Sequence, residues 1–150
     1  MIKICLCQLE VKSGHPSDNL TKMLHFIKEA KNNSADIIVF PELAVPGYFI
    51  GDTWDSPAFL RDCEECGREI INAADGIVII FGNIAVDWHK KNRDGRIRKY
   101  NALFTAQNKK LVTAPNAVYP FAIKTLHPNY REFDDTRYFC STMMLATELG

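Results

Sequence analysis

The sequence lacks both a long hydrophobic run and an excess of charge. No stretch reaches the roughly 18 uninterrupted apolar residues that a membrane span needs. The 18 basic residues balance the 18 acidic ones, so no global field would attract nucleic acid or an anionic membrane. The N-terminus runs directly into an apolar pattern, without the basic region and cleavage site of a signal peptide. We therefore expect a cytoplasmic protein that binds neither nucleic acid nor membranes.

Signals for disulfides, metals and nucleotides are also missing. Without a secretion signal, the five cysteines are expected to be free thiols in a reducing compartment. Cys63 and Cys66 form a single CxxC with no second Cys or His pair at zinc spacing, which argues against a zinc site. The four histidines are scattered. No GxxxxGK[ST] loop occurs, so ATP would have to bind a different domain.

The apolar pattern that is present predicts an α/β fold. Residues 2–9 are apolar on both alternating faces, as in a strand buried on both sides, and residues 36–40 read as a second strand. A helix between them, from Ser17 as N-cap to Asn32, has apolar residues at the i, i+3, i+4, i+7 spacing. This order favours a parallel pair of strands with a crossover helix.

The middle of the chain adds a second helix and a hairpin. Ser56 and Pro57 are a good N-cap and first-turn pair for a helix to Ala74. Residues 76–86 and 96–106 read as two strands joined by the turn signal Arg93-Asp94-Gly95. A short strand over 111–114 and an irregular stretch from Pro115 to Pro128 follow. The sheet is therefore expected to be mixed, and its two helices leave one face for something else to cover.

Glu42 is the most informative position for chemistry. It follows the apolar strand directly, in Phe40-Pro41-Glu42-Leu43, and ligands bind at the carboxyl ends of strands in α/β sheets. The apolar flanks should desolvate the carboxyl group and raise its pKa towards a value useful for a general base. The alternative is a carboxylate that caps the next segment or pairs with a lysine. Lys124 is second: it lies in an apolar segment, where a snorkelling surface lysine is the alternative.

Two motifs around these residues resemble a known family. Val39-Phe40-Pro41-Glu42-Leu43, followed by Pro46-Gly47-Tyr48, resembles the first catalytic motif of the nitrilase superfamily of carbon–nitrogen hydrolases. The stretch from Lys124 to Phe139, with Pro128-Asn129-Tyr130 and Arg137-Tyr138-Phe139, resembles the lysine motif of the glutaminase domain of glutamine-dependent NAD synthetases. The resemblance extends over the first 140 residues.

The resemblance implies a Glu–Lys–Cys triad, with Glu42 as general base and Lys124 stabilising the tetrahedral intermediate. It also implies that Tyr48 and Tyr130 line the glutamine pocket and that Phe133 and Asp135 lie in the segment that closes it. For these four residues, core aromatics and a solvated acid are the alternatives. The implied fold is a four-layer α-β-β-α sandwich, of which this chain would be the N-terminal part.

The sequence departs from the family pattern in three places. The family's cysteine follows a further apolar strand, whereas Cys140 comes sixteen positions after Lys124 with no strand before it, so we do not expect it to be the nucleophile. Residues 141–150 are an atypical tail after a partial domain of residues 1–140, and we expect them to be poorly fixed or docked on a neighbouring chain. Ala114 to Phe121 reads as an insertion, which would give Lys124 a different path into the site.

These features lead to three hypotheses. The first is a C-terminally truncated glutaminase domain that acts on L-glutamine, needs no cofactor, and belongs with a synthetase domain that would use ATP and Mg²⁺ to amidate deamido-NAD. The second is a stand-alone carbon–nitrogen hydrolase acting on another amide. The third is a non-catalytic remnant or interaction module. In each case a chain without the rest of its sandwich should associate, so a homo-oligomer is expected.

Overall fold

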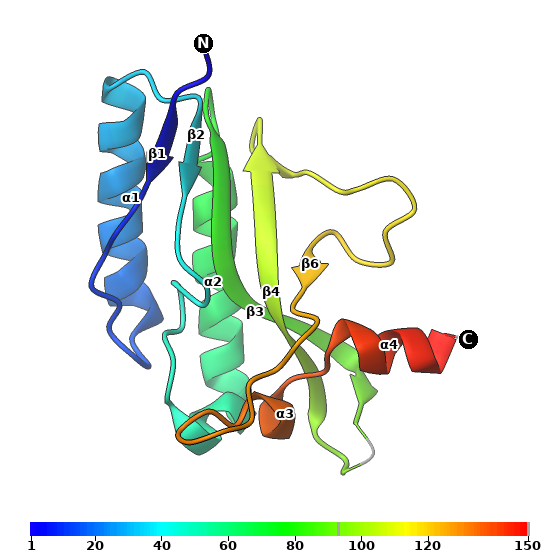
Figure 1. Cartoon of the computed structure of the whole chain (residues 1–150). Helices are drawn as coiled ribbons and strands as arrows, with labels where there is room; N and C mark the ends of the chain where they lie inside the picture. The colour runs from blue at the N-terminus through cyan, green and yellow to red at the C-terminus, as the bar shows by residue number, and fades with distance from the viewer. Residues whose placement is uncertain (93, 150) are drawn as a thin grey trace.

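The computed structural model describes residues 1–92 and 94–149, in which two long helices lie against one mixed sheet (Figure 1). The elements are β1 (Ile4–Leu6), α1 (Pro16–Asn32), β2 (Ile37–Val39), the short 3-10 helix η1 (Gly51–Asp55), α2 (Pro57–Asn72), β3 (Val78–Lys91), β4 (Ile97–Gln107), β5 (Lys110–Leu111), β6 (Ala122–Ile123), α3 (Asp135–Tyr138) and α4 (Thr142–Leu149). Strands β1, β2 and β3 are parallel, β4 is antiparallel to β3, and both β5 and β6 pair with β4. The predicted α/β class with a mixed sheet is confirmed.

The two long helices begin where proline allows a first turn. In α2, Ser56 is the N-cap as predicted, and its side chain accepts a hydrogen bond from the Phe59 amide at 3.4 Å. The predicted N-cap of α1 was wrong: the helix begins at Pro16 after His15, and Ser17 lies inside its first turn. The proline ring fixes φ near the helical value and lacks an N–H that would be unpaired there, so Pro16 decided the start.

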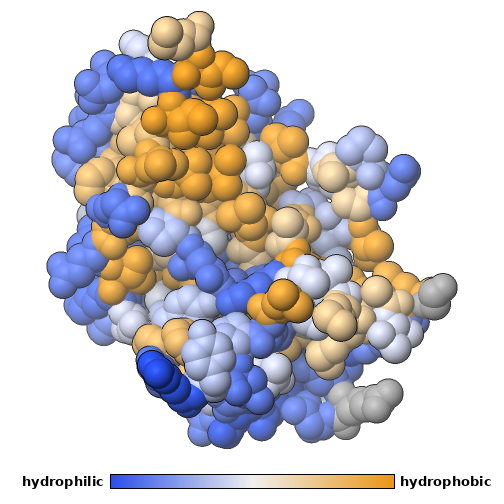
Figure 2. All heavy atoms as spheres, viewed as in Figure 1, coloured by the Kyte–Doolittle hydropathy of each residue, from blue (hydrophilic) through white to orange (hydrophobic). Residues whose placement is uncertain are grey.

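The two faces of the sheet differ in their surroundings. Ile38 and Ile79 are 0% exposed and belong to the core under the helices. Their neighbours along the strands lie on the other face, where Ile4 is 56% and Leu6 is 72% exposed. Figure 2 shows this hydrophobic area on the side of the sheet away from the helices. We call it the open face; it consists of Ile4, Leu6, Ile37, Val39, Val78, Ile80 and Leu103.

The open face corrects the expectation that the first strand is buried on both sides. The register aligns Leu6 with Val39 and Val39 with Ile80, which places apolar side chains of three strands on one surface. In the described part of the chain neither long helix covers that surface (Figure 1). The apolar pattern of β1 therefore indicates that both sides of the strand can be buried. The described part of the chain covers only one of them.

The hairpin of β3 and β4 is confirmed and is longer than predicted, since β3 continues to Lys91. Arg93, the first residue of the predicted turn, lies outside the described residues. The strand predicted over 111–114 is shorter and earlier, at Lys110–Leu111, and the stretch predicted as irregular contains β6.

The last residues form a helix that packs on their own chain, whereas they were expected to be poorly fixed or docked on a neighbouring chain. In α4, Glu148 pairs with the buried Arg98 of β4, and Leu145 is 6% exposed. Thr142 Oγ1 donates a hydrogen bond to the Ile123 carbonyl at 2.9 Å. Gly150 lies outside the described residues. None of the helices among residues 1–92 and 94–149 is long and apolar enough to cross a membrane.

Candidate active site

Glu42 lies on a segment that leaves β2 and crosses the open-face side of β3. The amide of Phe40 donates to the Ile80 carbonyl at 2.8 Å, and that of Val45 donates to the Gly82 carbonyl at 3.3 Å. These two bonds hold the chain between them against the strand. A Cβ placed on Gly82 would lie 2.4 Å from the Leu43 nitrogen and 2.7 Å from the Glu42 Cα. Glycine at position 82 is therefore what lets the segment carrying Glu42 approach the sheet.

Gly82→Ala is expected to destabilise the chain by about 1–3 kcal/mol or more, because the added methyl group meets backbone that cannot rotate away. Urea unfolding of the variant and wild type measures the difference. Gly67→Ala is the matched control, since its Cβ would meet the end of the Asn83 side chain at 3.0 Å and a helix interior favours alanine over glycine. Equal free energies of unfolding for the two variants would contradict this account of Gly82.

The short strand β6 positions Lys124, which follows it directly. Ala122 and Ile123 pair with β4, and the Lys124 amide donates to the Asn101 carbonyl at 2.9 Å. The insertion before it packs aside: Tyr119 and Phe121 stack on each other at 5.1 Å between ring centroids and contact the rings of β4. Pairing with β4 therefore fixes where the chain re-enters the site after the inserted residues.

The two predicted catalytic side chains meet. Lys124 Nζ lies 2.7 Å from Glu42 Oε1, well within the separation of about 6 Å expected for mutual charge stabilisation. The two residues are 82 positions apart in sequence. The predicted proximity of Glu42 and Lys124 is confirmed, and they lie on the open-face side of the sheet.

Two neutral side chains complete the cluster. Glu42 Oε1 accepts from Lys124 Nζ, from the Tyr48 hydroxyl and, at 2.6 Å, from Asn101 Nδ2. The Tyr48 oxygen in turn accepts from Asn101 Nδ2 and Lys124 Nζ, each at 3.2 Å. Asp135 Oδ2 accepts from Lys124 Nζ at 3.1 Å. Asn101 and Lys124 therefore each contact both Glu42 and the Tyr48 oxygen, and Lys124 also contacts Asp135.

These contacts reverse the pKa shift expected for Glu42. Burial does act to raise the pKa of its carboxyl group, as the apolar flanks suggested. Hydrogen bonds from Lys124, Tyr48 and Asn101 favour the ionised form and leave the pKa of Glu42 below its ordinary value. For Lys124, burial acts to lower the pKa, but hydrogen bonds to Glu42, Tyr48 and Asp135 raise it above the ordinary lysine value. Burial and the hydrogen bond to Glu42 raise the pKa of Tyr48 to about 12.

The lowered pKa of Glu42 predicts how stability responds to acid. A carboxylate whose folded pKa lies below its unfolded value stabilises the fold above the unfolded pKa, about 4.3 for glutamate, and loses this contribution as the pH falls through the folded pKa. Wild type should therefore lose more free energy of unfolding than Glu42→Gln between about pH 6 and about pH 3. Urea unfolding at both pH values measures the loss. Glu132→Gln, at an exposed acid, is the control and should match wild type; a Glu42→Gln slope equal to wild type would contradict the prediction.

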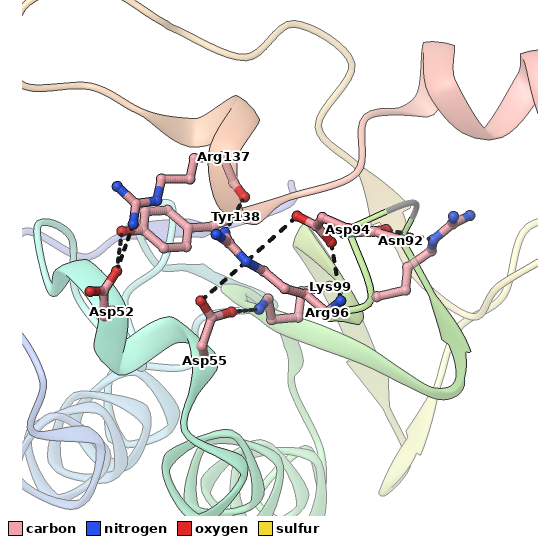
Figure 3. A network of polar contacts seen from close by, with 9 residues as sticks. Asp52, Asp55, Asn92, Asp94, Arg96, Lys99, Arg137 and Tyr138 are labelled. Carbon is pink, nitrogen blue, oxygen red and sulfur yellow. Dashed lines mark hydrogen bonds and ion pairs between the residues drawn. The ribbon is translucent and has the colours of Figure 1, made fainter.

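A polar network at one end of the sheet holds α3, the short helix that begins with Asp135 (Figure 3). Arg137 and Tyr138, in the same short helix α3, each contact Asp52 of η1 at 3.1 Å. Deeper in, the Lys99 side chain, which is 1% exposed, pairs with Asp55. The network joins η1, the β3–β4 hairpin and α3, and the Asp135 side chain, 5% exposed, is thereby presented to Lys124.

The remaining predicted substrate residues lie in an aromatic group beside the cluster. The Phe133 ring packs edge-on against that of Tyr48 at 6.2 Å between centroids, and Tyr130 packs on Phe133 at 5.5 Å. A cavity of about 500 Å³ is lined by Tyr48, Phe133, Asp135 and their neighbours, and a second of about 250 Å³ by Glu42, Asn101 and Lys124. Tyr130 is 63% exposed. The structure thus brings Tyr48 and Asp135 to Lys124, with Phe133 adjacent and Tyr130 at the rim.

Asn101 was missed by sequence reasoning. It lies in β4 between Tyr100 and Ala102, in no motif that marks it. A signal was present, since asparagine is depleted in strands and a buried amide needs hydrogen-bond partners. Asn101 is 2% exposed, and its partners are the site residues.

No cysteine lines either cavity in the described part of the chain. Cys140 is 0% exposed and packs with Tyr100 and Ala102 in a separate small cluster. Burial raises the pKa of its thiol, which works against the thiolate that a nucleophile requires. Cys63 and Cys66 are buried in α2 under the sheet. The arrangement therefore offers a base and a cation beside a cavity, without a reactive thiol.

His127 is a second polar group that no sequence pattern singled out. Its Nε2 is enclosed and has no hydrogen-bond partner among residues 1–92 and 94–149. Burial lowers its pKa, which favours the neutral imidazole. His127 therefore adds no positive charge beside Lys124 at neutral pH.

Comparison with known proteins supplies a family and relatives. The family model described as carbon–nitrogen hydrolase matches residues 3–119. A glutamine-dependent NAD(+) synthetase of Xanthomonas campestris is 32% identical over 92% of this chain and 22% of its own length. One from Acinetobacter baylyi is 30% identical over 91% of this chain and 23% of its own length. The chain thus spans about a quarter of the length of these relatives.

Solved structures with the same fold include a glutamine-dependent NAD+ synthetase from Acinetobacter baumannii, at 27% identity and a TM-score of 0.76, over 93% of this chain and 24% of that one. An amidase from Nesterenkonia sp. has 14% identity and a TM-score of 0.73, over 93% of this chain and 48% of its own; at that identity the likeness shows the fold alone. A variant of an amidase from Nesterenkonia sp. AN1 was solved with an acetamide moiety added covalently at its active-site cysteine.

Proposed function

The chain belongs to the carbon–nitrogen hydrolase family, and we propose that it is the base-and-lysine part of a glutaminase that releases ammonia from L-glutamine for a synthetase amidating deamido-NAD. The observation that carries this proposal is the hydrogen-bonded pair of Glu42 and Lys124 beside a cavity. Sequence relatives named glutamine-dependent NAD(+) synthetase support glutamine as the substrate.

In the proposed reaction a cysteine thiol loses its proton to Glu42, and the sulfur attacks the carboxamide carbon of glutamine. The tetrahedral intermediate collapses to a thioester as ammonia leaves with a proton returned from Glu42. Water, deprotonated by Glu42, then cleaves the thioester to glutamate and regenerates the thiol. The thiol would have to come from outside these 150 residues, since the five cysteines of this chain do not line the cavities.

The hydrogen bonds assign different tasks to the two oxygens of Glu42. Oε1 is occupied by three donors, whereas no donor among the described residues reaches Oε2. Oε2 is therefore the oxygen proposed to take the proton. Lys124 would stabilise a developing oxyanion by charge, and a direct bond would replace one of its two contacts longer than 3 Å, to Tyr48 or Asp135.

The proposed substrate pocket joins Tyr48, Tyr130, Phe133 and Asp135, with L-glutamine as ligand. The proposed partners are the remaining half of the sandwich and a synthetase domain, and copies of this chain are proposed to form a homo-oligomer through the open face. ATP and Mg²⁺ would act in the synthetase domain. In the described part of the chain, no group of three His, Cys, Asp or Glu side chains is placed so that it could hold a metal ion.

A chain of these 150 residues should release no ammonia from L-glutamine above the uncatalysed background, because base and cation are present without a thiol beside them. Ammonia assay of the pure protein measures this. Release that persists in Cys140→Ser and disappears in Glu42→Ala would show that another nucleophile works in the site. Release that disappears in Cys140→Ser would show that Cys140 reaches it.

The function itself is tested in a chimera in which residues 1–139 replace the matching segment of the Xanthomonas campestris synthetase. Ammonia release from glutamine by the chimera supports the proposal. Release from other small amides but not from glutamine would favour a carbon–nitrogen hydrolase of another specificity. An inactive but folded chimera would favour a non-catalytic module.

A further inference from the structure

Asn101 contacts both catalytic partners through different atoms. Its side-chain Nδ2 donates to Glu42 Oε1 at 2.6 Å, and its backbone carbonyl accepts from the Lys124 amide at 2.9 Å. The strand β4 holds this residue by pairing it with Ile84 of β3. One residue of a rigid hairpin therefore sets the positions of a carboxylate and an ammonium group that come from two different loops.

The orientation of the Asn101 amide follows from its neighbours. A carboxylate accepts hydrogen bonds and cannot donate, so the NH₂ group must face Glu42. The Tyr48 oxygen lies 3.2 Å from the same Nδ2 and can share its donation, because the Tyr48 hydroxyl proton is donated to Glu42.

The charges of the cluster show why a neutral donor matters at this position. Glu42 and Asp135 are two carboxylates sharing one ammonium group, that of Lys124. Like charges repel, so a second carboxylate on the same ammonium group makes further donors to Glu42 useful. Asn101 and Tyr48 add hydrogen bonds to the ionised form of Glu42 without adding charge. An aspartate at position 101 would add a third carboxylate, and a leucine would leave Oε1 with one donor fewer.

We propose that Asn101 is the positioning residue of the general base: it fixes Glu42 Oε1, keeps the carboxylate ionised beside Asp135, and leaves Oε2 to receive the proton. The proposal rests on the proposed function for the role of Glu42 as base. Its structural content, a hydrogen bond that controls the ionisation of Glu42, does not depend on which amide is the substrate.

NMR titration of the 150-residue chain tests this role without any turnover. In wild type, the side-chain amide resonances of Asn101 should move with pH at the same midpoint as the Glu42 carboxyl carbon. Asn83 is the matched control: it is equally buried on the neighbouring strand, but its Nδ2 donates to the Cys63 carbonyl at 2.9 Å and faces α2. The Asn83 amide should not follow the Glu42 midpoint.

Two variants extend the test. Asn101→Leu and Asn101→Asp should both shift the Glu42 midpoint to higher pH, the first by loss of a donor and the second by repulsion, whereas Asn83→Leu should leave it in place. If Asn101→Leu does not fold, the test rests on wild type, where the Asn101 amide resonances and the Glu42 carboxyl carbon should share one midpoint. The proposal would be overturned if the Asn101 amide resonances did not follow the Glu42 midpoint in wild type. It would also be overturned if folded Asn101→Leu left the Glu42 midpoint unchanged. Because no step uses glutamine, an inactive chimera would refute the proposed function and leave this result standing.

Discussion

Glu42→Gln is expected to lower kcat/KM for glutamine by about 10²–10⁴-fold in the chimera that carries residues 1–139, which is the range for loss of a positioned general base. Glutamine at position 42 keeps the length of the side chain and can still accept from Lys124 and Asn101. It cannot take a proton from a thiol. The loss should therefore appear mainly in kcat, because the proposed contacts to bound glutamine come from Tyr48 and the aromatic residues beside it.

Steady-state ammonia release by wild-type and variant chimeras gives both constants. Glu132→Gln is the control, since Glu132 lines the neighbouring cavity but makes none of the hydrogen bonds of the cluster, and it should change kcat by less than about 10-fold. A Glu42→Gln chimera with the kcat of wild type would remove Glu42 from the reaction. A raised KM with unchanged kcat would assign Glu42 to substrate binding.

Local patterns were enough to predict the two long helices and most strands. The i, i+3, i+4 spacing located α1, the Ser56-Pro57 pair gave the start of α2, and the turn residues between two apolar runs gave the β3–β4 hairpin. These signals are local in sequence, and the structures they specify close over a few residues. The start of α1 was misplaced because Pro16 outweighed Ser17.

The contact of Glu42 with Lys124 could not come from local pattern, since 82 residues separate them. It was predicted from the resemblance of two motifs to a family. The pKa of Glu42 was predicted in the wrong direction for the same physical reason. Its apolar flanks report only desolvation. The donors that lower the pKa of Glu42 are Lys124 after β6, Tyr48 in its loop and Asn101 in β4.

Asn101 shows what neither motif nor periodicity provides. Its side chain matters because Gly82 allows the Glu42 segment to lie close against β3. That approach depends on how three segments of the chain pack together. Such packing cannot be predicted from a single sequence. The prediction that β1 is buried on both faces was wrong for a related reason, because other elements of the fold have to cover each face of a strand.

The open face should drive association of the 150-residue chain, and Leu6→Lys should reverse it. Leu6 is 72% exposed on this face, and burying a leucine side chain contributes about 1.5–3 kcal/mol. A symmetric contact uses the residue twice, so its loss should weaken self-association on the order of 10²-fold or more. A lysine also places like charges opposite each other across the contact.

Size-exclusion chromatography with light scattering over a range of concentrations measures the change, against a monomer mass of 17.0 kDa. Val118→Lys is the matched control, because Val118 is 62% exposed in the loop before β6 and is not part of the open face. Wild type and Val118→Lys should associate alike, while Leu6→Lys approaches the monomer mass. A wild-type chain that runs as a sharp monomer and unfolds cooperatively would mean that the open face is tolerated in water and that no second copy covers it.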